Sequence, residues 1–129
     1  MDLILWRHAE AHEGLDDMPR ALTALGHTQA RQVGKWLDDA LPADTRILVS
    51  PAVRAQETAL GLGRVCETRD ELAPGADAVD IMSVCGWPEA KGSVLVIGHQ
   101  PTLGRLASMV LFGSGLVAVA GLARRRRRR

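Results

Sequence analysis

The fold is decided by the stretch Leu3-Ile4-Leu5-Trp6-Arg7-His8, near the start of this 129-residue chain. Four apolar residues are too few for a helix, and an arginine and a histidine follow them directly. This pattern is typical of a buried parallel strand whose carboxyl end opens into a loop. Because ligands of open α/β sheets bind outside the carboxyl ends of the strands, Arg7 and His8 are the first candidates for a functional site.

The same pattern occurs again further along the chain. The apolar run Val94-Leu95-Val96-Ile97 is followed by Gly98 and His99. A single histidine at a strand end is more often structural than catalytic, but two such histidines in one short chain favour a shared site. We therefore predict that His8 and His99 lie together at one edge of a parallel sheet.

The remaining elements alternate between strands and helices. We predict further strands over residues 46–50, 65–68 and 116–120, and helices after residue 23, after residue 50, over residues 77–84 and after residue 101. In this prediction Thr23 or Thr28 caps the first helix and Ser50, followed by proline, caps the second. The alternation predicts an α/β fold: a single layered domain with a largely parallel central sheet flanked by helices.

Six consecutive arginines at residues 124–129 dominate the net charge. The formal net charge is +1, and without these six positive charges it is −5. The remainder of the chain is mildly acidic and does not predict a nucleic-acid groove, so any site for an anion must consist of a few arginines at specific positions. We assign residues 1–123 to one domain, and residues 124–129 to a basic tail that is disordered or artefactual.

Three observations concern the cellular compartment. Cys66 and Cys85 have neither metal-ligand nor CxxC spacing, which indicates thiols in a reducing compartment. The first apolar run is too short for a signal peptide. The uncharged run over residues 106–123 has the length of a membrane helix, but the turn expected at residues 113–115 interrupts it. We therefore expect a cytoplasmic protein without a membrane anchor.

Arg54 is the second arginine expected near the edge with the two histidines. It lies one turn inside the helix that follows the strand over residues 46–50, although a surface ion pair with Glu57 is an alternative. His12, in the polar loop after the first strand, is another candidate, but a solvated loop histidine is the simpler interpretation.

Together, His8, His99, Arg7 and Arg54 predict a phosphate site. Two guanidinium groups favour a phosphate dianion. A neutral imidazole can attack phosphorus, while a second one stabilises the moving phosphoryl group. For such a nucleophile, we expect the other nitrogen of His8 to bind a backbone carbonyl. This chemistry requires no metal or other cofactor, and the ligand spacing of a metal site is missing.

Five motifs, in chain order, resemble the histidine phosphatase superfamily, which has the phosphoglycerate mutase-like fold. The motifs are Leu5-Trp6-Arg7-His8-Ala9-Glu10-Ala11; Leu22-Thr23 with Gly26; Ser50-Pro51 with Arg54, Ala55 and Thr58; Leu72 with Pro74 and Gly75; and Val96-Ile97-Gly98-His99-Gln100-Pro101. The resemblance covers residues 1–112, and the chain is similar to the short SixA-type phosphohistidine phosphatases. Beyond Phe112 the sequence departs from the family, and a last strand there would be altered or truncated.

The resemblance implies a role for individual residues. His8 becomes the phosphorylated nucleophile, Arg7, Arg54 and His99 complete the catalytic phosphate pocket, and Arg20 flanks it as a substrate-binding residue. The implied function is metal-independent removal of phosphate from phosphohistidine on a signalling or phosphocarrier protein, through a covalent phosphohistidine on the enzyme.

The general acid of larger superfamily members has no clear counterpart in this chain. Glu71, Asp77 and Asp80 fall in the corresponding region but in no recognisable motif. An imidazole leaving group needs less acid assistance than an alkoxide, which favours a phosphohistidine substrate. Two alternatives stay open: a phosphatase of small phosphomonoesters, and a phosphate-binding module without turnover.

Overall fold

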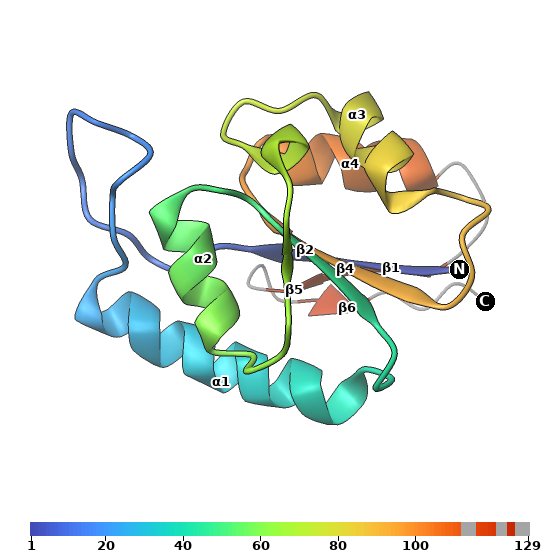
Figure 1. Cartoon of the computed structure of the whole chain (residues 1–129), viewed down its shortest axis with the longest axis horizontal. Coiled ribbons are helices and arrows are strands. Elements are labelled where there is room, and N and C mark those ends of the chain that lie inside the picture. Colours follow the sequence, from blue (N-terminus) through green and yellow to red (C-terminus); the bar gives the residue numbers. More distant parts are fainter. Residues whose placement is uncertain (112–115, 121–123, 126–129) are drawn as a thin grey trace.

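The computed structural model describes residues 1–111, 116–120 and 124–125. These residues form a central sheet with helices on both faces (Figure 1). The strands are β1 (Asp2–Arg7), β2 (Arg46–Val49), β3 (Glu67–Thr68), β4 (Ser93–Gly98), β5 (Leu116–Ala120) and β6 (Arg124–Arg125); the helices are α1 (Ala24–Ala40), α2 (Val53–Leu60), α3 (Ala78–Cys85) and α4 (Thr102–Leu111), with a short 3₁₀ helix over Asp70–Leu72. The predicted α/β order is therefore confirmed.

The sheet is largely parallel, as predicted. Its strand order is β3-β2-β4-β1-β5-β6, and only the pairing of β5 with β6 is antiparallel among the described strands. The strands β1 and β4 are direct neighbours, with Arg7 opposite Gly98. This register places His8 and His99, the next residues of the two strands, at the same edge of the sheet.

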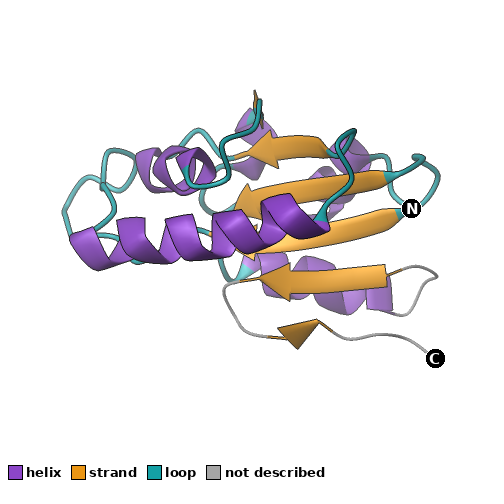
Figure 2. Ribbon diagram, turned by 90° about the horizontal axis from the view of Figure 1, so that it is seen from below, coloured by secondary structure: helices purple, strands orange, loops and turns teal. Residues whose placement is uncertain are grey.

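The alternation of side chains along the strands divides the core into two layers. One face of the sheet presents Leu3, Leu5 and Val96 to α3 and α4. The opposite face presents Trp6 and Ile97 to α1 and α2. Figure 2 shows α1 lying across this second face. Because β1 and β4 are covered on both sides, they consist of nearly continuous apolar runs.

Helix α1 begins at one of the two N-caps that were predicted from the sequence. The Thr23 hydroxyl accepts a hydrogen bond of 3.0 Å from the Gly26 backbone N–H, so Thr23 is the N-cap. Gly26 also lies against the loop after β1, so closely that a Cβ at this position would clash with the Glu10 carbonyl. Only glycine therefore allows the loop to pass this close to the start of α1.

The prediction that Ser50 caps the second helix is wrong. Helix α2 begins at Val53, and Ala52 occupies the N-cap position without a side-chain hydrogen bond. The backbone of Ala52 is extended (φ −62°, ψ 140°), which separates Ser50 from the helix by two residues. The Ser50 hydroxyl instead contacts His99, a residue that is distant in the sequence.

The C-terminal predictions fall partly on described residues. The predicted strand over residues 116–120 is β5, and Arg124–Arg125 continue the sheet as β6. The predicted turn at residues 113–115 and residues 126–129 lie outside the described residues, and the domain boundary at residue 123 stays a prediction. Within the described ranges, the helices are too short or too polar to cross a membrane.

Candidate active site

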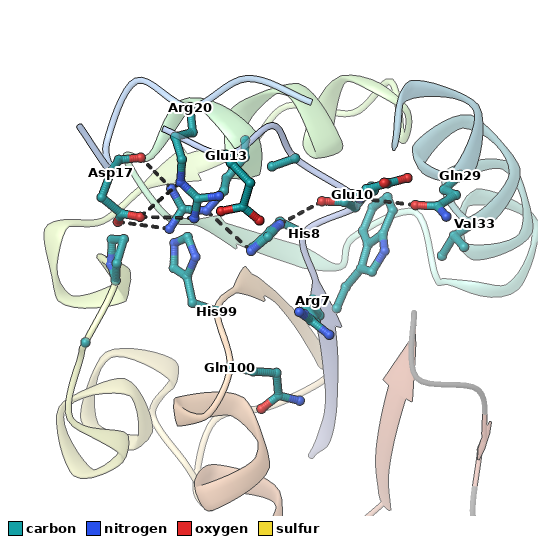
Figure 3. Close-up of a pocket in the computed structure, with 16 residues that line it drawn as sticks. Arg7, His8, Glu10, Glu13, Asp17, Arg20, Gln29, Val33, His99 and Gln100 are labelled. Carbon is teal, nitrogen blue, oxygen red and sulfur yellow. Dashed lines mark hydrogen bonds and ion pairs between the residues drawn. The ribbon is translucent and has the colours of Figure 1, made fainter. Parts of the chain in front are cut away.

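A pocket of about 770 Å³ opens at the carboxyl edge of the sheet. Its lining comes from the end of β1, the loop over residues 8–23, α1, the start of α2, the loop with Pro74 and Gly75, and the segment between β4 and α4 (Figure 3). All five residues predicted to form the site line this pocket: Arg7, His8, Arg20, Arg54 and His99. His12 is exposed and does not line it, which agrees with a solvated loop histidine.

The His8 imidazole is held with one nitrogen toward the backbone and one toward the pocket. Its Nδ1 lies 2.7 Å from the Ala9 carbonyl oxygen, the kind of partner expected for a nucleophilic histidine. Its Nε2 lies 3.4 Å from Nε of Arg54, which donates to it. Because a carbonyl can only accept, Nδ1 carries the proton and Nε2 carries the lone pair.

Burial is the main reason that the pKa of His8 is lowered below that of ordinary histidine. The hydrogen bond with Ala9 opposes this shift, whereas the positive charges of Arg54, Arg7 and Arg20 add to it. A lowered pKa keeps the imidazole neutral at neutral pH, and a neutral imidazole has the free electron pair that nucleophilic attack requires.

Arg54 is nearly inaccessible to solvent, with 3% of its surface exposed. Its guanidinium donates to the Asp17 carbonyl oxygen at 2.7 Å and to Asp17 Oδ2 at 3.1 Å, besides the contact with His8. The alternative ion pair with Glu57 is not formed, because Oε1 of Glu57 accepts a hydrogen bond from the Leu22 backbone N–H. Arg54 therefore points into the pocket and not toward the surface.

Asp17 joins two of the three arginines that line the pocket, Arg20 and Arg54. Its Oδ1 accepts hydrogen bonds from Nε (3.2 Å) and a terminal nitrogen (3.0 Å) of Arg20, and Oδ2 accepts from Arg54. The hydrogen bond with Arg54 is the largest cause that lowers the pKa of Asp17, and Arg20 contributes in the same direction. Figure 3 shows Asp17 beside Arg20, with the dashed interactions between them. Asp17 was not predicted from the sequence, since it is one of several acidic residues in a loop without periodicity.

His99 is 5% exposed, and its ring centroid lies 5.2 Å from that of His8. Its Nε2 lies 2.7 Å from the Ser50 hydroxyl. Desolvation by burial, followed by the positive charge of Arg54, lowers the pKa of His99 to about 4. Nδ1 of His99 is buried and has no hydrogen-bond partner within the described part of the chain.

Thr58 ties the end of β1 to the start of α2. Its hydroxyl accepts a 3.0 Å hydrogen bond from the Ala9 backbone N–H and donates a 2.7 Å bond to the Arg54 carbonyl oxygen. The segments that carry His8 and Arg54 are thus joined through one buried side chain. The spacing of Ser50, Arg54 and Thr58 in one motif was the only sequence signal for this support.

The three carboxylates considered as general acids do not line the pocket. Glu71 binds Arg69 at 2.8 Å, and Asp77 caps α3 by accepting from the Val79 N–H. The carboxylates that do line it are Glu10, Glu13 and Asp17. In the described residues, no group of three or more metal-ligating side chains is arranged to hold a metal ion.

Comparisons with known proteins agree with this arrangement. The profile of the histidine phosphatase superfamily (branch 1) matches residues 3–84. Phosphohistidine phosphatase SixA of Escherichia coli strain K12 is 32% identical over 117 residues, covering 84% of this chain and 73% of the relative. The SixA homolog of Haemophilus influenzae is 34% identical over 124 residues, covering 84% and 76%.

Similarity extends to solved structures. The structure of the protein histidine phosphatase SixA complexed with tungstate superimposes with a TM-score of 0.74 at 31% identity, covering 84% of this chain and 75% of that one. The matched profile includes the segments that carry His8 and Arg54. The profile, the relatives and the common fold show that the chain belongs to branch 1 of the histidine phosphatase superfamily, and so to a family of phosphatases.

Proposed function

We propose that this phosphatase removes phosphate from phosphohistidine on a partner protein, without a metal, through a covalent phosphohistidine at His8. The observation that carries the proposal is the orientation of His8. Its Nδ1 is bound to a backbone carbonyl, and its Nε2 faces the guanidinium of Arg54 in a pocket that holds two further arginines. A nucleophile and the charges that bind its target are therefore side by side.

The reaction would occur in two displacements. In the first, Nε2 of His8 attacks phosphorus, the new N–P bond forms, and the N–P bond to the substrate imidazole breaks; the departing imidazole takes a proton from water. In the second, the oxygen of a water molecule attacks phosphorus, a P–O bond forms, the N–P bond to His8 breaks, and inorganic phosphate leaves; one proton of that water neutralises the hydroxide left by the first step. Arg7, Arg54 and His99 would stabilise the charge on the phosphoryl oxygens in both steps.

The carboxylates of the pocket support a substrate with a good leaving group. The pKa of Asp17 is lowered by Arg54 and Arg20, so this carboxylate is ionised at neutral pH and cannot donate a proton. Glu71, Asp77 and Asp80 lie elsewhere. Phosphohistidine releases an imidazole, which needs less acid assistance than an alkoxide. The names of the SixA relatives agree with this substrate class.

A phosphatase of small phosphomonoesters is a second candidate, and one observation favours it. Glu10 and Glu13 line the pocket and are exposed at its mouth, where a carboxyl group could protonate an alkoxide. Neutralising these residues separates the two functions. If the second candidate holds, Glu13→Gln and Glu10→Gln abolish turnover of an alkyl phosphate; under the proposed function, both variants leave turnover of phosphohistidine nearly unchanged. Glu71→Gln, outside the pocket, is the matched control.

The test offers a histidine-phosphorylated carrier protein and a small alkyl phosphate in parallel, both in EDTA. We expect the carrier to lose its phosphate and the alkyl phosphate to remain. Preference for the alkyl phosphate would replace the proposal with the second candidate. Binding of inorganic phosphate without turnover of either compound would show a phosphate-binding module, and activity that EDTA abolishes would contradict the metal-free mechanism.

We also propose a cytoplasmic location. Cys66 and Cys85 are both free thiols, as expected in a reducing compartment. Fractionation of cells that express the chain, followed by immunodetection, tests this location. Recovery with the membrane fraction would contradict it.

A further inference from the structure

Ser50 is completely buried between the end of β2 and the pocket, next to His99. Its hydroxyl oxygen accepts a 3.2 Å hydrogen bond from the Ala52 backbone N–H and lies 2.7 Å from Nε2 of His99. The role of this hydroxyl is not to cap α2, since that helix begins three residues later. A short, buried contact with one ring nitrogen of a pocket histidine suggests a role in the site.

The hydrogen bonds around Ser50 determine which nitrogen of His99 carries the proton. The Ser50 oxygen already accepts from Ala52, so its own proton needs an acceptor. Nε2 of His99 is the acceptor at hydrogen-bond distance in the described structure. If Ser50 donates to Nε2, then the proton of the neutral imidazole must lie on Nδ1.

The opposite arrangement is unfavourable. A proton on Nε2 would make His99 the donor to Ser50, and the Ser50 proton would then have no acceptor within the described residues. That arrangement would leave two buried groups unpaired, the Ser50 O–H and the lone pair on Nδ1 of His99, whereas a proton on Nδ1 leaves only the Nδ1–H unpaired. The choice between the two tautomers exists only because His99 is neutral, since a charged imidazolium carries a proton on both nitrogens.

Nδ1 of His99 is the group that this arrangement makes a donor. It is buried and has no hydrogen-bond partner within the described part of the chain, and it belongs to a ring that lines the pocket. Such a buried N–H is stabilised when an acceptor enters the pocket. A phosphoryl oxygen is an acceptor of this kind, and three arginines and His8 line the same pocket.

We propose that Ser50 is a positioning residue: by donating to Nε2 it holds His99 in the tautomer whose Nδ1–H hydrogen-bonds a phosphoryl oxygen in the pocket. Ser50 itself does not touch the phosphoryl group. The proposal rests on the proposed function in that it assigns the pocket to a phosphoryl group, but the tautomer can be measured without any turnover.

The first experiment is NMR of the ¹⁵N-labelled full chain at neutral pH. Two-bond ¹H–¹⁵N spectra distinguish a protonated ring nitrogen from one that carries a lone pair. The chain has four histidines, so the His99 signals are identified by their loss in His99→Gln. We expect the proton on Nδ1 in the wild type, and a mixture of both tautomers in Ser50→Ala. A proton on Nε2 of His99 in the wild type would overturn the proposal.

The second experiment is a double-mutant cycle on turnover of the phosphorylated carrier protein. Ser50→Ala should lower kcat by about 10- to 100-fold, by analogy with residues that orient a metal-binding histidine through its second ring nitrogen. In a His99→Ala background the same change should have less than about a twofold effect, because Ser50 acts through His99. Equal effects in both backgrounds would show that Ser50 has only a structural role.

A control separates the loss of a hydroxyl from the loss of this contact. Thr45 is buried and its hydroxyl donates a 2.7 Å hydrogen bond to the Pro42 carbonyl, at the opposite end of β2 from Ser50 and outside the pocket lining. Thr45→Val should destabilise the protein by an amount similar to Ser50→Ala and leave kcat unchanged.

Titration with inorganic phosphate tests the pocket when turnover is absent. If the wild type converts neither phosphorylated compound, the proposed function fails, but Ser50→Ala should still weaken phosphate binding. Unchanged phosphate affinity in Ser50→Ala, together with an unchanged tautomer, would reject the role of Ser50 independently of the activity.

Discussion

The two sides of the pocket differ in how firmly they are held. The strand-end side (His8, Arg54 and His99, with Ser50 behind His99) is built on β1, β2, α2 and β4, and Ser50, Arg54 and His99 are at most 5% exposed. The loop side (Glu13, Asp17 and Arg20) lies on the long segment between β1 and α1, where the Asp17 side chain is 52% exposed and that of Arg20 21%.

This difference indicates that the two sides of the pocket have different roles. Charges on the buried side act in a medium of low polarity, in positions fixed by hydrogen bonds to the backbone. Charges on the loop side are partly screened by water and salt. The strand-end side should therefore determine the chemistry, and the loop side should adjust the affinity for phosphate.

The largest effect is expected for the nucleophile on the strand-end side. His8→Ala should reduce turnover of phosphohistidine by at least about 10³-fold, because no neighbouring group replaces the attacking nitrogen. Rapid acid-free quenching with labelled substrate should also show loss of the phosphorylated enzyme. His12→Ala is the matched control, since His12 is an exposed histidine of the loop and lies outside the pocket lining. An active His8→Ala protein would show that both sides had been assigned incorrectly.

Arg54→Lys should have the next largest effect, with kcat reduced by about 10²-fold. Lysine keeps the positive charge but lacks the planar fork that contacts both His8 and Asp17. Steady-state kinetics and calorimetric titration with inorganic phosphate would measure the losses in rate and affinity. Arg64→Lys is the control, because Arg64 makes a comparable set of bonds to Asp38 and Leu41 away from the pocket. Wild-type kinetics in Arg54→Lys would mean that charge alone is sufficient on the buried side.

The burial of His99 predicts how stability depends on pH. Its folded pKa is about 4, whereas ordinary histidine has 6.5. Between these values the unfolded chain binds more protons than the folded chain, so the stabilisation is complete above pH 6.5 and is lost as the pH falls toward 4. The slope contributed by His99 is at most about 1.4 kcal/mol per pH unit. His8, whose pKa is lowered too, acts in the same direction.

Urea unfolding of the wild type and of His99→Gln at several pH values would measure this slope. We expect the slope between pH 6.5 and 4 to be smaller in His99→Gln and unchanged in His12→Gln. If His99→Gln retained the full slope, the environment of His99 would be more polar than the structure shows.

The smallest effect is expected on the loop side. Arg20→Ala should weaken binding of inorganic phosphate by only about two- to fivefold, the size of a partly exposed ion pair. The effect should decrease further at high salt, whereas that of Arg54→Lys should not. Arg31→Ala, an exposed arginine of α1, controls for the change in net charge. An Arg20→Ala defect as large as that of Arg54→Lys would remove the distinction between the two sides.

Much of the framework was predictable because its signals are local. The apolar runs before His8 and His99 mark buried strands, and Thr23 marks the start of α1. The placement of both histidines at one edge was predictable because the carboxyl ends of parallel strands meet there, whereas the direct pairing of β1 with β4 was not predicted. Ser50 was assigned incorrectly because the prediction used only local signals. A serine followed by proline has the local pattern of a helix start, whereas the actual partner of Ser50 is His99, which is distant in the sequence.

The amino-acid sequence by itself determined the α/β order, the strand ends that carry His8 and His99, and the family. Only the tertiary structure decided that Ser50 contacts His99, 49 residues away, and that Asp17 bridges to Arg54, 37 residues away. The physical reason is that periodicity and capping act over a few residues, whereas these contacts depend on strand order. Placing β4 between β2 and β1 brings Ser50 and His8 to either side of His99.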